Sequence, residues 1–213
     1  MSVRENLNRI LKDIENYDTT LIAVTKYYDI EKMIEAFNAG LRNFAESKAI
    51  ESIEKISKID DTTRNQSVYH FIGHLQTNKV KYVVGNFDYI HSVDSLKLAQ
   101  CIDLEAQKKG IIQKILIQVN NANEEQKFGI EPKELDNLIN EMAKLKSIEL
   151  KGLMNIAPYC VQENELRKLF SEMRELKERY GLQELSMGMS NDYKIALECG
   201  ATMIRLGRIL FEN

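Results

Sequence analysis

The stretch LIAVTK, residues 21–26, decides the fold expected of this chain. Four apolar residues and a threonine lead into Lys26, which is the pattern of a short buried strand that ends at a polar edge. Similar segments recur along the chain: RNFAES (42–47), VYHFIG (68–73), DYIHSV (88–93), KILIQVN (114–120), ELKGLMNIA (149–157), ELSMGMS (184–190) and ATMIRLG (201–207). The series predicts eight short strands.

Between most of these strands lie segments whose apolar residues have helical spacing. Residues 30–40 and 95–110 each read as a helix, and each stops at a glycine, Gly40 and Gly110. Residues 132–146 open with Pro132, whose missing N–H does no harm in a first turn. Residues 1–16 read as an amphipathic helix that precedes the first strand, with one apolar face made of Val3, Leu7, Ile10, Leu11 and Ile14.

Strands that alternate with helices run parallel and are joined by right-handed crossovers. Eight such units in 213 residues predict an α/β fold, a single (β/α)8 TIM barrel over residues 1–213, close to the lower size limit of such barrels. The alternative is an open doubly wound sheet, which more often carries a Gly-rich phosphate turn after its first strand. No such turn follows VTK (24–26), so the barrel is favoured.

Composition narrows the class of protein. The formal net charge of −3 gives no basic surface for nucleic acid or for an anionic membrane, and no apolar run approaches the roughly 20 residues that span a bilayer. The N-terminus is too polar for a signal peptide. Three scattered cysteines without a CxxC pair indicate free thiols in a reducing compartment. We therefore expect a cytoplasmic protein that binds neither nucleic acid nor membrane.

Polar or ionisable residues end the predicted strands. Active sites of (β/α)8 barrels gather at this edge, although strand ends that meet water are polar in any case. For the set as a whole a site is the better interpretation. Its members are Lys26, Glu46 with Ser47, His74, Ser92 with Asp94, Asn120, Asn155, Ser190 and Arg205.

Lys26 has two interpretations. A desolvated lysine amine is a Schiff-base nucleophile, whereas a lysine at a sheet edge can simply reach water. Strand alternation places Ile22, Val24 and Lys26 on one face, and if that face lines the barrel, Lys26 projects into the site.

The C-terminal quarter of the chain contributes two strand-to-helix turns. Ser190 is a candidate N-cap, and Gly188 lets the backbone bend near a ligand. Arg205 lies in an apolar strand, where it needs either a ligand or a structural ion pair. Gly207 follows at the next turn, so two turns above the seventh and eighth strands could bind an anion, where phosphate sites in these barrels often lie. His70 and His74 lie on a strand and a loop, which does not predict a metal site.

Together these segments resemble the YggS/PROSC family of pyridoxal phosphate homeostasis proteins, and they are similar to the N-terminal barrel of alanine racemase, fold type III of the pyridoxal enzymes. The resemblance spans almost the whole chain, through AVTK (23–26), HFIGHLQTNK (70–79) and LSMGMSND (185–192). It implies pyridoxal 5′-phosphate as cofactor, held as a Schiff base on Lys26. It further implies a phosphate site at Ser190 with N–H groups of Asn191, Gly207 and Arg208, Arg205 at the pyridine nitrogen, and pocket walls at Ser47, His74 and Met154.

The sequence departs from the family pattern in three places. FAES (44–47) replaces the usual FGEN, so Ala45 stands for a glycine and Ser47 for an asparagine that can contact the cofactor. Arg208 stands where a small or hydroxyl residue is frequent, and Tyr69 occupies a common tryptophan position. These changes bear on the affinity for the cofactor.

The residues favour a carrier over an enzyme. Pyridoxal enzymes that use the ring as a strong electron sink place an acidic side chain beside the ring nitrogen, which keeps that nitrogen protonated. A guanidinium can only donate hydrogen bonds, so Arg205 disfavours a protonated ring nitrogen. In the resembled racemase the second base comes from an additional C-terminal domain, which this chain lacks. The same domain supplies a dimer contact in the racemase, so we expect this chain to be a monomer. Tyr27, Tyr28 or His74 could substitute as bases. Partners would include apo-enzymes that accept the cofactor. The alternatives are a weak pyridoxal phosphate-dependent racemase or lyase, and a cofactor-free Schiff-base aldolase on Lys26.

Overall fold

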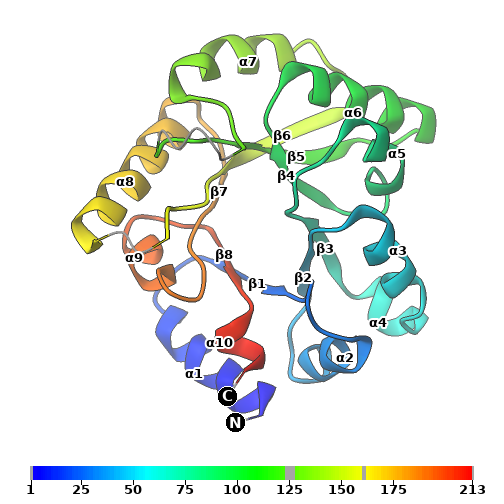
Figure 1. Cartoon of the computed structure of the whole chain (residues 1–213), viewed down its shortest axis with the longest axis vertical. Coiled ribbons are helices and arrows are strands. Elements are labelled where there is room, and N and C mark those ends of the chain that lie inside the picture. Colours follow the sequence, from blue (N-terminus) through cyan, green and yellow to red (C-terminus); the bar gives the residue numbers. More distant parts are fainter. Residues whose placement is uncertain (1, 123–127, 160–161, 213) are drawn as a thin grey trace.

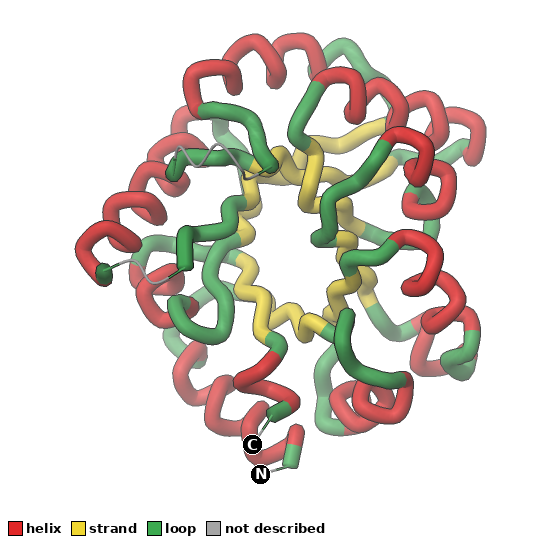
Figure 2. The backbone as a smooth tube through the Cα atoms, viewed as in Figure 1, coloured by secondary structure: helices red, strands yellow, loops and turns green. Residues whose placement is uncertain are grey.

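Eight parallel strands close into a ring in the computed structural model, which describes residues 2–122, 128–159 and 162–212. The strands pair in chain order, and β1 pairs with β8 to complete the barrel (Figure 2). The predicted (β/α)8 barrel is confirmed, with all eight predicted strands. They are β1 Thr20–Val24, β2 Asn43–Glu46, β3 Val68–Phe71, β4 Tyr89–Val93, β5 Gln113–Gln118, β6 Ile148–Met154, β7 Glu184–Ser186 and β8 Met203–Leu206.

Helices surround the ring on its outside (Figure 1). The described α-helices are α1 Val3–Ile14, α2 Ile30–Asn38, α3 Ala49–Ser57, α4 Asp61–Asn65, α5 Val80–Val83, α6 Leu96–Lys109, α7 Leu135–Met142, α8 Glu163–Arg179, α9 Tyr193–Glu198 and α10 Arg208–Phe211. Two 3-10 turns, η1 Thr77–Lys79 and η2 Pro132–Glu134, precede α5 and α7. No helix among the described residues is long and apolar enough to cross a membrane.

Local signals set the helix ends. Ser2 and Glu5 form a capping box at the start of α1, and Gly110 ends α6 with a left-handed φ of 65°. Helix α1 buries the predicted apolar face except Leu11, which is 45% exposed. The prediction for Leu11 is wrong, because the buried stripe includes Asn6, whose amide bonds to the Leu210 carbonyl of the C-terminal helix.

The alternation of each strand separates two cores. An inner cluster fills the barrel and contains Ile22, Ala45, Leu116, Met154 and Met203, with Val24 packed against it. Strand neighbours such as Leu21 and Ala23 belong instead to the outer core beneath the helices. The prediction that Ile22 and Val24 face the barrel interior is therefore confirmed. Lys26 follows them at the carboxyl end of the ring.

Candidate functional site

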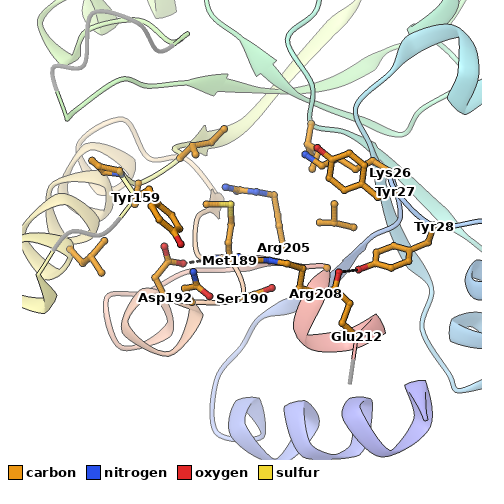
Figure 3. Close-up of a pocket in the computed structure, with 18 residues that line it drawn as sticks. Lys26, Tyr27, Tyr28, Tyr159, Met189, Ser190, Asp192, Arg205, Arg208 and Glu212 are labelled. Carbon is orange, nitrogen blue, oxygen red and sulfur yellow. Dashed lines mark hydrogen bonds between the residues drawn. The ribbon is translucent and has the colours of Figure 1, made fainter. Parts of the chain in front are cut away.

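A cavity of about 760 Å³ opens at the carboxyl ends of the strands, over β1, β7 and β8 (Figure 3). Of the residues predicted for the site, the cavity is lined by Lys26, Ser190, Asn191, Arg205, Gly207 and Arg208. The structure thus brings together residues at or just after the carboxyl ends of β1, β7 and β8, which the closure between β1 and β8 makes neighbours.

Lys26 is held by the residue before it. Thr25 is fully buried; its hydroxyl donates to Glu46 Oε1 at 2.7 Å, and its carbonyl accepts a hydrogen bond from Lys55 Nζ at 2.8 Å. Lys55 also pairs with the same Glu46 oxygen at 2.8 Å. This buried triad fixes the backbone from which Lys26 enters the cavity, with its ammonium 4.9 Å from the centre of the Tyr27 ring.

Two turns form the opposite wall of the cavity. Ser190 and Asn191 lie in the turn between β7 and α9, Gly207 lies between β8 and α10, and Arg208 is the first residue of α10. The N-cap of α9 is Asp192, so the prediction of Ser190 as an N-cap is wrong. The Asp192 carboxylate bends back to accept the Met189 N–H at 2.5 Å, which ties the turn and delays the helix to Tyr193.

Arg205 lies at the bottom of the cavity and is only 3% exposed. Nη1 donates to Ser186 Oγ at 2.5 Å and Nη2 donates to the Asn155 carbonyl at 2.7 Å. These partners are neutral, so the ion-pair alternative for Arg205 finds no direct partner among the described residues. Burial lowers the pKa of Arg205 to about 10, opposed by the charge of Asp192, so the side chain remains a cation at neutral pH.

Three predicted residues lie outside this cavity. Met154 is fully buried in the inner cluster, and Ser47 does not line the cavity wall. His74 lines a second cavity, with Nδ1 3.7 Å from an Asp94 carboxylate oxygen, and its ring stacks on Phe128 at 3.7 Å.

The expected ring of strand-end groups is therefore only partly assembled. Glu46 points outward into the triad with Lys55, and Ser92 is 1% exposed, so neither reaches the cavity. The alternation explains both positions, because their strand neighbours Ala45 and His91 face the barrel interior. Polarity at a strand end did not distinguish an inward side chain from an outward one.

Several residues that shape the site were missed. Tyr159 and Ile156 line the cavity from the segment after β6, and Asp192 and Glu212 line it beside the two turns. Burial raises the pKa of Asp192, against the bond from the Met189 N–H. His91 and Ser186, which meet inside the barrel, were also not predicted. The alternation of side chains along β4 and β7 is the sequence signal that could have placed them on the inward face. Among the described residues no group of three or more His, Cys, Asp or Glu side chains could bind a metal ion.

The fold and the cavity define a (β/α)8 barrel that presents an amine, a buried guanidinium and a serine-bearing turn to one cavity. Residues 1–212 match the family described as alanine racemase, N-terminal domain. The chain is 36% identical to the pyridoxal phosphate homeostasis protein of Aquifex aeolicus, over 99% of this chain and 98% of that protein. It is 40% identical to the pyridoxal phosphate homeostasis protein of Synechocystis, over 90% of this chain and 89% of that protein.

A solved structure agrees with these relatives. PipY of Synechococcus elongatus, with PLP bound, superimposes with a TM-score of 0.90 at 35% identity, covering 98% of this chain and 99% of that one. The chain therefore belongs to the pyridoxal phosphate homeostasis protein family.

Proposed function

We propose that this protein binds pyridoxal 5′-phosphate reversibly in the cavity over β1, β7 and β8, and stores, buffers or delivers it within the cell. One observation carries the proposal: Lys26, Ser190 and Arg205 line the same cavity. The names of the relatives and the PLP bound to PipY support it. When bound, the cofactor would supply an aldehyde with which an amine can form a Schiff base, and among the described residues Lys26 is the lysine that lines this cavity.

The donor set fits the two charged ends of the ligand. Ser190 with the turn at Asn191, and Gly207 with Arg208, offer hydroxyl, N–H and guanidinium donors to a phosphate. Arg205 faces the cavity as a donor only and suits a ring nitrogen without a proton. The roles of Ser47, His74 and Met154 would be indirect, because none of them lines this cavity.

The same arrangement favours a carrier over a catalyst. Protonation of the ring nitrogen strengthens the electron sink of pyridoxal enzymes. The Arg205 guanidinium is always charged and cannot accept a hydrogen bond from a protonated ring nitrogen, so it does not support that state. Of the candidate second bases, Tyr27 and Tyr28 line the cavity, but Tyr27 is 82% exposed and Tyr28 donates its hydroxyl to Glu212 at 2.8 Å. His74 lines another cavity. A carrier also needs an accessible site, which an open cavity at the barrel edge provides. We extend the proposal to a cytoplasmic monomer that passes the cofactor to apo-enzymes.

The test begins with the visible spectrum of purified protein supplied with pyridoxal 5′-phosphate, before and after borohydride reduction. We expect a yellow band that reduction removes, and a pyridoxyl-phosphate adduct on Lys26 in peptide mass mapping. Lys26→Ala should remove band and adduct, whereas Lys79→Ala, in the second cavity, should retain both. A colourless parent protein, or an adduct that persists in Lys26→Ala, contradicts the proposal.

Two further measurements separate the alternatives. A weak racemase or lyase exchanges the Cα proton of at least one amino acid for deuterium, and we expect no exchange above the rate of free cofactor. A cofactor-free aldolase is trapped on Lys26 by borohydride only with a carbonyl substrate, whereas a carrier is trapped with pyridoxal 5′-phosphate alone.

A further inference from the structure

A continuous row of hydrogen bonds crosses the barrel interior beneath the cavity. It runs from Arg205 Nη1 to Ser186 Oγ (2.5 Å), from Ser186 Oγ to His91 Nδ1 (3.0 Å), from His91 Nε2 to His70 Nδ1 (2.9 Å) and from His70 Nε2 to Asn43 Oδ1 (3.1 Å). The link between Ser186 on β7 and His91 on β4 joins strands that are not neighbours in the ring. The row therefore spans the lumen from β8 to β2.

Donor chemistry gives this row a single direction. Arg205 can only donate, so Ser186 accepts from it and has its own hydroxyl proton free for His91 Nδ1. The Asn43 amide oxygen can only accept, so His70 Nε2 carries a proton and His70 Nδ1 accepts from His91 Nε2. Reasoning from either end gives the same assignment, in which both histidines are neutral with the proton on Nε2.

Burial supports the neutral state of both rings. His91 is 0% exposed and His70 is 1% exposed, and His70 stacks on Tyr89 at 5.0 Å. Desolvation lowers the pKa of His70 to about 3 and lowers the pKa of His91 well below its usual value, with the charges of His70 and Arg205 adding to the second shift. A protonated His91 would present two donors, and Ser186 would then have no acceptor for its hydroxyl.

We propose that Ser186, His91 and His70 are positioning residues that fix the rotation of the Arg205 guanidinium, so that it selects a ligand with an unprotonated ring nitrogen in the cavity. The role deepens the proposed function and rests on it. Hydrogen bonds to Ser186 and to the Asn155 carbonyl use two of the five guanidinium N–H groups and anchor both terminal nitrogens. Loss of the Ser186 anchor frees the guanidinium to turn away from the ligand.

The first experiment needs no cofactor. The chain contains only three histidines, so side-chain ¹⁵N spectra of histidine-labelled protein resolve each ring, and His74 outside the barrel serves as the comparison. Between pH 6 and 8 we expect His70 and His91 to show the neutral form with the proton on Nε2. A proton on Nδ1 of either ring, or a charged ring, overturns the directed row.

The second experiment measures selectivity by comparing dissociation constants for pyridoxal 5′-phosphate and for its analogue with C–H in place of the ring nitrogen. We expect the parent to prefer pyridoxal 5′-phosphate by about tenfold, the scale of one hydrogen bond to a charged group. His91→Leu and Ser186→Ala should bring this ratio close to one. His91→Gln, which can accept and donate in the same direction, should retain it.

Leu116→Ala is the matched control, because Leu116 is buried in the same lumen but lies outside the row. It should lower stability and leave the ratio unchanged. An undiminished ratio in Ser186→Ala, or an equal loss in Leu116→Ala, overturns the positioning role. A parent that binds neither ligand instead refutes the proposed function, while the ¹⁵N spectra still decide the row.

Discussion

Glu46→Gln tests the buried triad that carries Lys26. The substitution keeps the shape of the side chain and an acceptor for the Thr25 hydroxyl, but it leaves the Lys55 ammonium without its counter-ion. The two side chains are 4% and 15% exposed, and the ion pair spans 2.8 Å. Coulomb's law with an effective dielectric near 20 gives about 6 kcal/mol for this pair, of which desolvation of two ions offsets a large part.

We therefore expect Glu46→Gln to lower the free energy of unfolding by about 3 kcal/mol, the low end for breaking a buried pair, because Lys55 retains its bond to the Thr25 carbonyl. Lys55→Met in the Glu46→Gln background should recover at least half of this loss, since it removes the uncompensated charge. Urea unfolding followed by circular dichroism and by the fluorescence of the nine tyrosines measures both changes, provided that the two transitions coincide.

The matched control is Lys144→Met, because Lys144 is 67% exposed in its ion pair with Glu141, and this change should alter stability by less than about 1 kcal/mol. A loss below about 1 kcal/mol for Glu46→Gln, or no recovery in the double variant, would refute the view that this pair stabilises the strand end at Lys26.

Three other predictions follow from the geometry. Gly152→Ala should destabilise the barrel by about 3 kcal/mol in urea unfolding, because its Cβ would lie 1.9 Å from a β7 carbonyl oxygen; Gly181→Ala, with open space but a φ of 62°, should cost only about 1 kcal/mol. In the unfolded chain both histidines take up protons near pH 6.5, whereas in the folded protein His70 and His91 stay neutral. The free energy of unfolding should therefore fall as pH drops below 6.5, by up to about 2.7 kcal/mol per pH unit for the two groups. Replacing both histidines by glutamine should flatten this pH dependence. Arg208→Ser should weaken pyridoxal 5′-phosphate binding up to about fivefold in fluorescence titrations and leave binding of phosphate-free pyridoxal unchanged, because an exposed cation contributes up to about 1 kcal/mol.

The fold was predictable because its signals are local. Alternation within LIAVTK gives the inward face of Ile22 and Val24 without reference to any other strand. Gly110 ends its helix through a conformation that other residues adopt at a cost. The same local signals also place Lys26 just after β1 and Arg205 on β8, two strands that closure of the ring makes adjacent.

The site was predictable only in part, because its remaining features depend on distant contacts. Alternation gives the outward direction of Glu46, but its partner Lys55 lies on α3, which no pattern within β2 encodes. The pairing of His91 with Ser186 crosses the lumen between residues 95 positions apart, which no pattern within a single strand encodes.

The closure of the ring by β1 and β8 also imposes an order in time. Roughly 180 residues separate Lys26 from Arg205, and at about 5–20 residues per second the ribosome makes the lysine some 10–35 s before the arginine. The two ends of the chain then meet, as α10 packs beside α1 (Figure 1). An unfinished chain carries the amine without the guanidinium or the turns beside it. Tight retention of a ligand at this site is therefore a property that a nascent chain acquires only after β8 has been made, and it reports that the barrel has closed.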